Sequence, residues 1–410
     1  MIWMLPSLNY DITDPKYMLL GKIFDFLDSK KSLNCLSRAG IKNRKMTVFC
    51  IKILFMAMFF DYTVSGVVNE LNRSNKLRKF IGTIDDLPAV EQVYEFLSRS
   101  SAEQYCKYVN SILNMFNKKT RGKYNKFIVD ATPSACDFNL DKKFITPEHL
   151  EKLKLKWSYS TTKGSYIGFK VTMVLNKKTM APVSILIHSG APHDSRIFDE
   201  ILKELKRRRI IKDKDILLFD RGYFSYNNYL IGINKYKIAP VIFPNNKFSI
   251  DRLKALMSLP LEACDESQKA VELKNKITSI VKVLYAELEK WDDLKPIRGI
   301  IEDFFKVAKN AFGLGEFHSY TVESMSRNIY LCLLLTTLIV QEGYKTKTKL
   351  QRLSEGDVVQ DTPITKKTNN KEEKSNEDNK TNEDSIKKEK TGQQMLEYGT
   401  KFYQSKLSKF

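Results

Sequence analysis

Hydrophobic and polar positions follow two different rhythms along the chain, and the change falls near residue 119. Before that point, apolar residues recur at the three- and four-residue spacing of helices, for example over 90–97 and 105–116. The pair Ser101 and Gln104 matches a capping box at the start of the second of these helices. The pattern predicts an all-α N-terminal domain over residues 1–118.

After Lys126 the chain alternates between short apolar runs, typical of buried strands, and longer segments with one apolar face. The order is strand, two paired strands, helix, strand, helix, strand and helix, which is the order of a ribonuclease H-like domain. We therefore predict an α/β domain over residues 119–350, with a mixed five-stranded sheet flanked by helices and a mostly helical insertion at about 245–295. The predicted strands are 127–130, 167–175, 183–188, 216–220 and 238–243.

The end of the chain has a different composition. Residues 356–395 are rich in Lys, Glu, Asn, Asp and Thr, and they contain too few apolar residues to bury a core. We predict that residues 351–410 form a largely disordered, charged C-terminal tail.

The chain has a net charge of +20. Residues 361–390 hold eight Lys and eight Asp or Glu, and residues 391–410 add +2, so +18 belongs to residues 1–360. A basic folded body favours a polyanionic partner, with nucleic acid as the leading candidate, although a merely soluble basic protein would show the same excess. The basic residues between the N-terminal helices could likewise hold DNA or could be solvated turns around a packing platform.

The six cysteines and four histidines form no CxxC or HxxxH pattern, which disfavours a zinc site. Scattered thiols without a secretion signal fit a reducing compartment, so we expect a cytoplasmic, nucleoid-associated protein. The apolar runs 48–60 and 329–340 are shorter than the roughly 20 residues that a bilayer requires. We therefore predict that both are core helices and that no membrane is involved.

Two aspartates end strand-like runs. Asp130 follows FIV, and Asp220 follows ILLF before the tight exit Arg221–Gly222. A charge at the end of a buried strand is costly unless it is paired or ligated, so each is a candidate metal ligand. Each could also be an ordinary turn residue or helix cap.

A third acid lies on the amphipathic helix predicted over 297–312. At about 100° per residue, Arg298, Glu302 and Lys309 lie within roughly 40° of one another on the helical wheel, beside the apolar stripe. Glu302 could complete a metal site while the two cations hold phosphates on either side. The alternative is a solvated face with an i,i+4 Arg–Glu pair.

Three converging carboxylates would suit one kind of chemistry. Hydrolysis or transfer of a phosphodiester is assisted by two Mg²⁺ ions about 3.5–4 Å apart, which carboxylate oxygens hold. The residues Asp130, Asp220 and Glu302 are thus candidates for both metal binding and catalysis.

The spacing R-x3-E-x6-K at Arg298, Glu302 and Lys309 resembles the Y-x2-R-x3-E-x6-K signature of a large family of cut-and-paste insertion-sequence transposases with a DDE catalytic domain. Four more segments resemble that family in the same order, and together the similarity covers about residues 126–340. They are FIVDATP around the first aspartate, the hairpin GSYIGFKVTMVLNKKTMAPV, the loop and helix GAPHDSRIFDEIL, and LLFDRGYFSYNNY around the second aspartate.

The resemblance implies a homodimeric DNA transposase, an endonuclease of DNA recombination. It would bind the terminal inverted repeats of its element, cleave the transposon ends and join the 3′-OH ends to target DNA. Asp130, Asp220 and Glu302 would hold two Mg²⁺ ions, for which Mn²⁺ should substitute, and Arg298 and Lys309 would contact phosphates. The N-terminal helices would contribute to recognition of the ends and to dimer formation.

One position departs from the signature. Lys295, followed by Pro296, stands where the family has the Tyr that helps hold phosphate near the transposon end. Lysine can neutralise a phosphate but cannot stack or present a phenol. This departure leaves open a catalytically degenerate DNA-binding protein, and another ribonuclease H-like nuclease is a further alternative.

Several other residues are candidates with two interpretations each. Lys163 and Lys170, and Arg221 after the second aspartate, could contact DNA phosphates or could be solvated charges. His193 and Asp194 could support the active site, but for Asp194 we favour a helix N-cap. Trp157 and Tyr159 could stack on a base, although we expect core aromatics.

Overall fold

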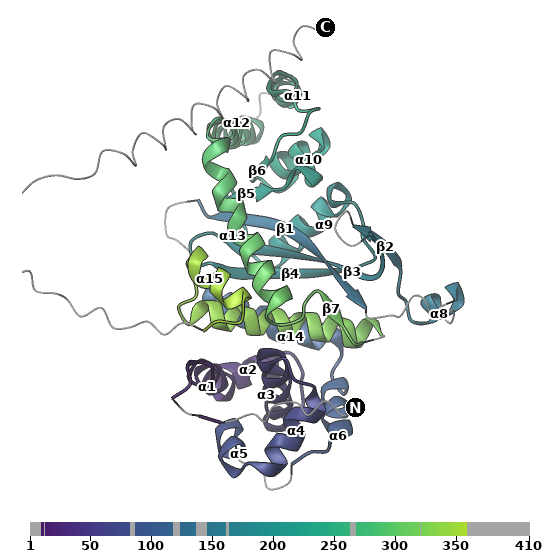
Figure 1. The fold of residues 1–410 in the computed structure, drawn as a ribbon. Coiled ribbons are helices and arrows are strands. Elements are labelled where there is room, and N and C mark those ends of the chain that lie inside the picture. The colour runs from purple at the N-terminus through teal and green to yellow at the C-terminus, as the bar shows by residue number, and fades with distance from the viewer. Residues whose placement is uncertain are drawn as a thin grey trace, which may run out of the picture. The chain divides into compact units, whose positions relative to one another are not determined.

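The computed structural model describes residues 10–11, 13–82, 87–117, 124–136, 146–160, 164–262, 268–319 and 321–358. Every regular element described between residues 10 and 117 is a helix, as the periodicity predicts (Figure 1). The capping box is present, since the Ser101 side chain accepts from the Gln104 amide and Gln104 accepts from the Ser101 amide. The helices are α1 Pro15–Asp28, α2 Lys30–Arg38, α3 Arg44–Phe60, α4 Val64–Arg73, α5 Asn75–Ile81, α6 Val90–Ser98 and α7 Ala102–Phe116.

The remaining described residues form an α/β fold, in which helices pack against a sheet of parallel and antiparallel strands. Its strands are β1 Lys126–Cys136, β2 Trp157–Ser160, β3 Gly164–Asn176, β4 Ala181–Ser189, β5 Ile216–Phe219, β6 Ala239–Ile242 and β7 Glu316–Phe317. Its helices are α8 Pro147–Lys152, α9 Asp194–Arg207, α10 Tyr226–Leu230, α11 Ile250–Glu262, α12 Gln268–Glu289, α13 Trp291–Asn310, α14 Val322–Gln341 and α15 Lys347–Ser354, with a 3-10 turn η1 Arg221–Tyr223 and a π-helical turn η2 Ile231–Lys235.

The sheet has the predicted ribonuclease H-like order. β1 is central, antiparallel to β3 on one side and parallel to β5 on the other, while β4 pairs with β3 and β6 pairs in parallel with β5. The mixed sheet flanked by helices is confirmed, although among the described residues it has seven strands where five were predicted. The additional strands are short: β2 pairs with the first residues of β3, and β7 pairs with the last residues of β1.

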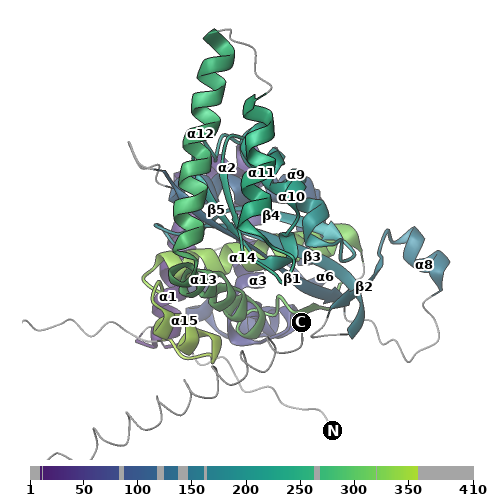
Figure 2. The ribbon, with the colours of Figure 1, turned by 90° about the horizontal axis from the view of Figure 1, so that it is seen from above.

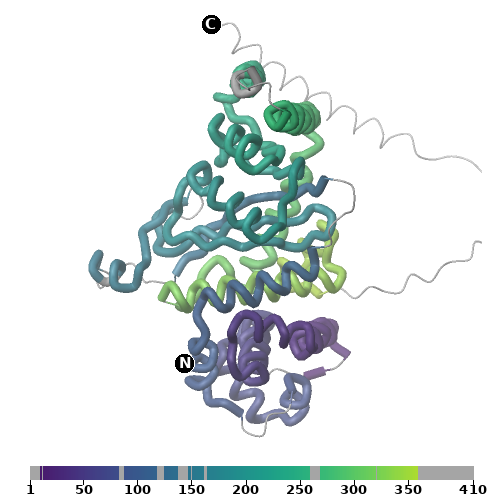
Figure 3. Tube along the Cα trace, turned by 180° about the vertical axis from the view of Figure 1, so that it is seen from behind, coloured from purple at the N-terminus to yellow at the C-terminus, as the bar shows by residue number. Residues whose placement is uncertain are grey.

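Helices cover both faces of the sheet. In Figure 1 the helix α13 crosses in front of the strands and contacts β1, whereas α9 lies behind them, as the reverse view in Figure 3 confirms. The predicted insertion is helical: α11 and α12 project together from the end of the sheet near β6 (Figure 2). The helix α13 begins at Trp291 and therefore joins the insertion directly to the sheet.

The C-terminal boundary differs from the predicted one. The helix α15 runs to Ser354, and its residues Leu350 and Leu353 are buried, so the first residues assigned to the tail belong to the folded body. The apolar face of this helix was too short to be recognised in a charged context. The rest of the predicted tail, from residue 359 onward, lies outside the described residues.

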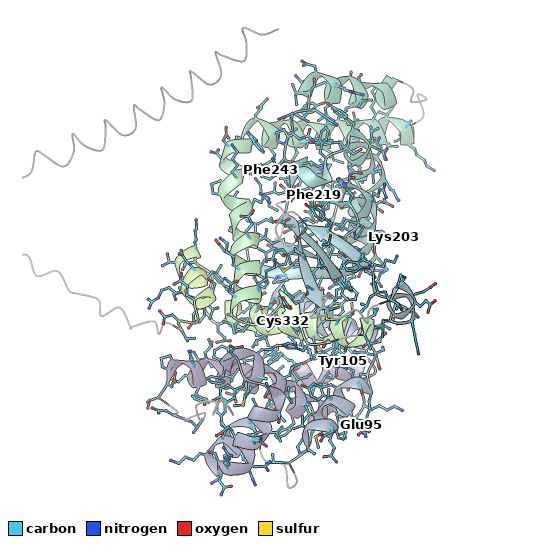
Figure 4. The ribbon with its side chains drawn as sticks, turned by 45° about the vertical axis from the view of Figure 1, so that its right-hand side comes forward. Glu95, Tyr105, Lys203, Phe219, Phe243 and Cys332 are labelled. Atoms are coloured by element: carbon cyan, nitrogen blue, oxygen red, sulfur yellow. The ribbon has the colours of Figure 1, made fainter. Side chains whose placement is uncertain are left out.

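The helix α14 joins the two parts of the fold. It contacts β4 on one side and α3 and α7 on the other, and all its residues from Met325 to Val340 are buried except Asn328. Figure 4 labels Cys332 on α14 and Tyr105 on α7, two helices that contact each other at this junction. The described residues up to 358 lie within one compact unit that ends at Gln360.

No single described helix is long and apolar enough to cross a membrane. The pair α3 and α4 would be long and apolar enough only if the two helices are taken together, and they are bent by 107° relative to each other.

One arginine contributes polar contacts to the same junction. Arg208, just after α9, donates to the side chain of Asn110 at 2.9 Å and to that of Asn114 at 2.8 Å, both on α7. Its guanidinium also donates to the hydroxyl of Ser184 in β4 at 3.2 Å. A single guanidinium therefore connects α7, β4 and the end of α9.

Replacing Arg208 with methionine should lower the free energy of unfolding by about 2–4 kcal/mol, because several acceptors lose a charged donor. Arg207→Met is the matched control, since Arg207 is exposed and pairs with Glu204 on its own helix. It should change stability by less than about 1 kcal/mol. Urea unfolding of the full chain measures both, and equal losses would contradict the role of Arg208.

Candidate active site

The first two acids lie side by side because of strand register. β1 and β5 are parallel, with Val129 opposite Phe219, so the next residues along, Asp130 and Asp220, occupy equivalent places. Neighbouring strands are about 4.8 Å apart, which brings the two carboxylates to one end of the β1–β5 pair. Asp220 directly follows β5, as predicted.

Asp130 does not end its strand, contrary to the prediction. β1 continues for six residues to Cys136, because the later residues pair with β3 and, at their end, with β7. The side chain of Asp130 is only 14% exposed. Its Oδ1 accepts from the amide of Ala131 at 2.8 Å.

The third acid comes from the helix that crosses β1. Glu302 lies in the middle of α13, one turn after Arg298, and buried residues on the same helix such as Ile301 and Phe305 face the sheet. This apolar face fixes the rotation of α13, so that the neighbouring edge of the helix, which carries Arg298 and Glu302, meets the ends of the strands.

One guanidinium contacts all three carboxylates. The Nη2 atom of Arg298 lies 3.0 Å from Oε1 of Glu302, 3.5 Å from Oδ1 of Asp220 and 3.6 Å from Oδ2 of Asp130. Because all three oxygens lie within 3.6 Å of the same nitrogen atom, the three carboxylates lie close to one another. The three acids, which are distant in sequence, converge on one cation.

Burial and charge act in opposite directions on Asp130. Removal from water is the main cause that raises the pKa of this carboxyl, the negative charges of Asp220 and Glu302 add to the rise, and the pKa with all effects included is about 7. The Arg298 guanidinium and the Ala131 amide favour the charged form and limit the rise. Three carboxylates this close together need a cation between them.

The donor set suits a hard divalent ion. Carboxylate oxygens are the ligands that Mg²⁺ prefers, and the cluster already accommodates a cationic group at ion-pair distance. Among the described residues, however, no three His, Cys, Asp or Glu side chains form a ready-made metal site. The guanidinium lies among the acids, so an ion could bind all three only after Arg298 has moved.

The other predicted phosphate contacts are placed in different surroundings. Lys295 is exposed, and its Nζ lies 2.7 Å from Asp292 and over the Trp291 ring. Lys309, near the end of α13, lines a cavity of about 790 Å³ together with residues of α3 such as Phe59. Arg221 is exposed in η1, directly after Asp220. Lys163 lies outside the described residues.

Lys170 points inward. Its Nζ donates to the Pro192 carbonyl at 2.7 Å and to Oδ1 of Asp194 at 2.9 Å, and its side chain is 16% exposed. Asp194 is not the N-cap of α9, contrary to expectation, because His193 occupies that position and accepts from the Ser195 amide. Asp is a preferred N-cap residue and His is not, so the capping rule placed the start of this helix one residue too late.

The structure contradicts the expectation for the two aromatic residues of β2. Trp157 and Tyr159 are not core aromatics: they are 54% and 67% exposed on β2, which pairs only with β3. Sequence reasoning also overlooked Tyr223, which is fully buried beside the site. Burial first, and then the negative charges of Asp194 and Asp130, raise the pKa of its phenol well above the usual value. The aromatic residue three positions after Asp220, in DRGYF, was the sequence signal that could have identified this residue.

The chain was compared with curated proteins and with solved structures. No curated protein matches the chain. Among solved structures, the piggyBac transposase synaptic complex with hairpin DNA shares 11% identity at a TM-score of 0.35, covering 84% of this chain and 80% of that one. The Drosophila P element transposase strand transfer complex shares 11% identity at a TM-score of 0.26, covering 82% and 90%. Neither value is high enough to bear on activity.

The family comparison is more informative. The model described as "Transposase DDE domain" matches residues 121–339, which is more than half of the chain. This range contains the whole sheet, the helix α13 and all three acids. The chain belongs to the transposase DDE domain family.

Proposed function

We propose that this protein is the DNA transposase of an insertion sequence, of the group with the Y-x2-R-x3-E-x6-K signature. It would bind the terminal inverted repeats of its element, cleave at the transposon 3′ ends and join the freed 3′-OH to target DNA. The observation that carries the proposal is the convergence of Asp130, Asp220 and Glu302 on Arg298, within a transposase DDE domain.

We further propose that the three acids hold two Mg²⁺ ions, with Mn²⁺ as a substitute. The proposal is supported by the hard oxygen donors and by the cation that they already surround. Bound there, the ions would supply charge neutralisation at the attacking and leaving oxygens of the phosphodiester. The chain would supply the carboxylates, their orientation by β1, β5 and α13, and a site that is partly shielded from water.

Arg298 would have two positions in this proposal. Without metal it neutralises the carboxylates, and with metal it is free to contact a DNA phosphate, which a guanidinium can grip with two donors. Lys309, Arg221, Lys295 and Lys163 are proposed as further phosphate contacts. The net charge of +18 on residues 1–360 supports DNA as the partner.

The N-terminal helices are proposed to assist in recognition of the ends and in formation of a homodimer in the synaptic complex, in a cytoplasmic, nucleoid-associated protein. We assign different functions to these helices and to the catalytic part, although both lie in one compact structural unit.

One gel assay separates this function from its rivals. With Mg²⁺ and DNA that bears the element's ends, a transposase gives cleaved and joined products. A ribonuclease H-like nuclease without strand transfer would give cleaved products only, and a degenerate DNA-binding protein would give a shifted band only. Lys295 in place of the signature Tyr is the residue that favours the last outcome.

The substitution Asp220→Ala should abolish Mg²⁺-dependent nicking and leave binding of end DNA largely intact, because it removes a metal ligand and no proposed phosphate contact. Nicking is followed on gels, and binding by mobility shift in EDTA. Asp199→Asn is the control, since Asp199 pairs with Lys235 on the surface of α9. Wild-type nicking by the Asp220 variant would show that the site is wrongly assigned.

The substitution Arg298→Met tests the cation among the acids. In EDTA it should lower the free energy of unfolding by about 1–3 kcal/mol, because three carboxylates lose their shared partner. Lys295→Met, one turn earlier with an exposed ion pair, should cost less than about 1 kcal/mol. Urea unfolding gives both values.

The same variant should respond more strongly to metal. Ca²⁺ should raise the melting temperature of Arg298→Met more than that of the wild type, since the ion no longer displaces a guanidinium. Equal shifts in the two proteins would argue against a metal site at Arg298.

A further inference from the structure

The start of α9 lies against the turn that carries Asp220. Asp194 is the first residue of α9, and η1 follows Asp220 immediately. The amide of Asn228 joins the two, since it donates to the Ser195 carbonyl at 3.1 Å and to the Tyr223 carbonyl at 2.8 Å. The support of Asp220 therefore comes partly from a helix on the far face of the sheet.

One oxygen of Asp194 is held in place. Its Oδ1 accepts from Lys170 Nζ, and the same ammonium group donates to the Pro192 carbonyl just before α9. Lys170 lies within β3, a central strand that pairs with β1 and β4. The carboxylate is thus fixed to the sheet rather than free to turn in solvent.

The other oxygen lies where a side chain on the turn would be. A Cβ atom added at Gly222 would come within 2.7 Å of Oδ2 of Asp194, and within 3.4 Å of its Cβ and Cγ. Gly222 is not among the residues with positive φ, so its backbone conformation does not demand glycine. The close approach of Asp194 is what excludes a side chain at this position.

The turn itself has few other supports. Asp220 lies beyond the last paired residue of β5, and its carbonyl accepts from the Tyr223 amide at 3.0 Å to close η1. On its other side, the Tyr223 ring packs against Phe219 with centroids 5.1 Å apart. Besides the ion pair with Arg298 at 3.5 Å, the direction of the Asp220 carboxylate therefore depends on how this turn packs.

We propose that Asp194, held by Lys170, is a positioning residue: the turn 220–222 packs against its carboxylate, and this contact sets the direction of the Asp220 side chain. The inference rests on the proposed function of Asp220. Lys170 then acts through Asp194 within the protein rather than on DNA, and Gly222 is required as the residue small enough for the contact.

A double-mutant cycle tests the contact. Asp194→Ala should slow nicking of end DNA by about 10–100-fold, since a misplaced catalytic group of this kind costs up to roughly 10²-fold. Gly222→Ala should slow nicking by at least about 10-fold, because its methyl group meets Oδ2. In the double variant the methyl group enters vacated space, so nicking should be within about 2-fold of Asp194→Ala alone. Losses that multiply would overturn the inference.

The matched control is Asp199→Asn. It removes an Asp–Lys pair from the same helix, with Lys235 at 2.8 Å, but lies away from the Asp220 turn. Its nicking rate should stay within about 2-fold of the wild type. A loss as large as that of Asp194→Ala would mean that α9 is merely sensitive to charge.

Two readouts separate positioning from general damage. In the Asp194→Ala variant, the rise of the melting temperature with Ca²⁺ should be smaller than in the wild type, while binding of end DNA in EDTA stays unchanged. Lys170→Met should behave in the same way. Weakened DNA binding by Lys170→Met alone would show that Lys170 contacts DNA instead. Should Asp194→Ala fail to fold, Asp194→Asn replaces it in the cycle, with an expected loss of about 10-fold.

The outcome for this inference is distinct from that for the proposed function. If wild-type protein neither nicks DNA nor responds to Ca²⁺, the proposed function fails, whatever the cycle shows. If the wild type nicks and Asp194→Ala nicks at the same rate, the proposed function stands and the positioning role fails.

Discussion

The mutual repulsion of three carboxylates is the constraint on which this site depends. β1, β5 and α13 bring Asp130, Asp220 and Glu302 to one place, where three negative charges lie close together and burial makes the charge of Asp130 costly. A single guanidinium on the same helix as Glu302 compensates for them. The guanidinium therefore offsets part of the repulsion among the three carboxylates.

The sequence predicts most of the framework because the framework follows from local patterns. Apolar runs mark the five main strands, and helical periodicity marks α7, α9 and α13. The short strands escape prediction for a physical reason. β7 has only two residues, and β2, although it is as long as β5 and β6, lacks their continuous apolar run because Ser158 and Ser160 interrupt it. Trp157 and Tyr159 look like core residues by type, but an edge position leaves them exposed.

The candidate site is predicted in its members but not in its contacts. The helical wheel puts Arg298 beside Glu302, and strand-end acids suggest Asp130 and Asp220. That one guanidinium reaches all three depends on strand register and on the rotation of α13, which are tertiary properties. The pairing of Lys170 with Asp194 is equally invisible in sequence, because a lysine on a hairpin and an acid at a helix start each have a sufficient local explanation.

The burial of α14 has a consequence for any dissection of this protein. A helix whose two sides are covered by different halves of the chain belongs to neither half. A fragment beginning at residue 119 would expose to water the apolar side of α14 that contacts α3 and α7. The helical fragment that remains would in turn lose the contacts that α3 and α7 make with α14. Such pieces are prone to aggregate, so the N-terminal helices and the sheet with its helices are best studied together, in the intact chain.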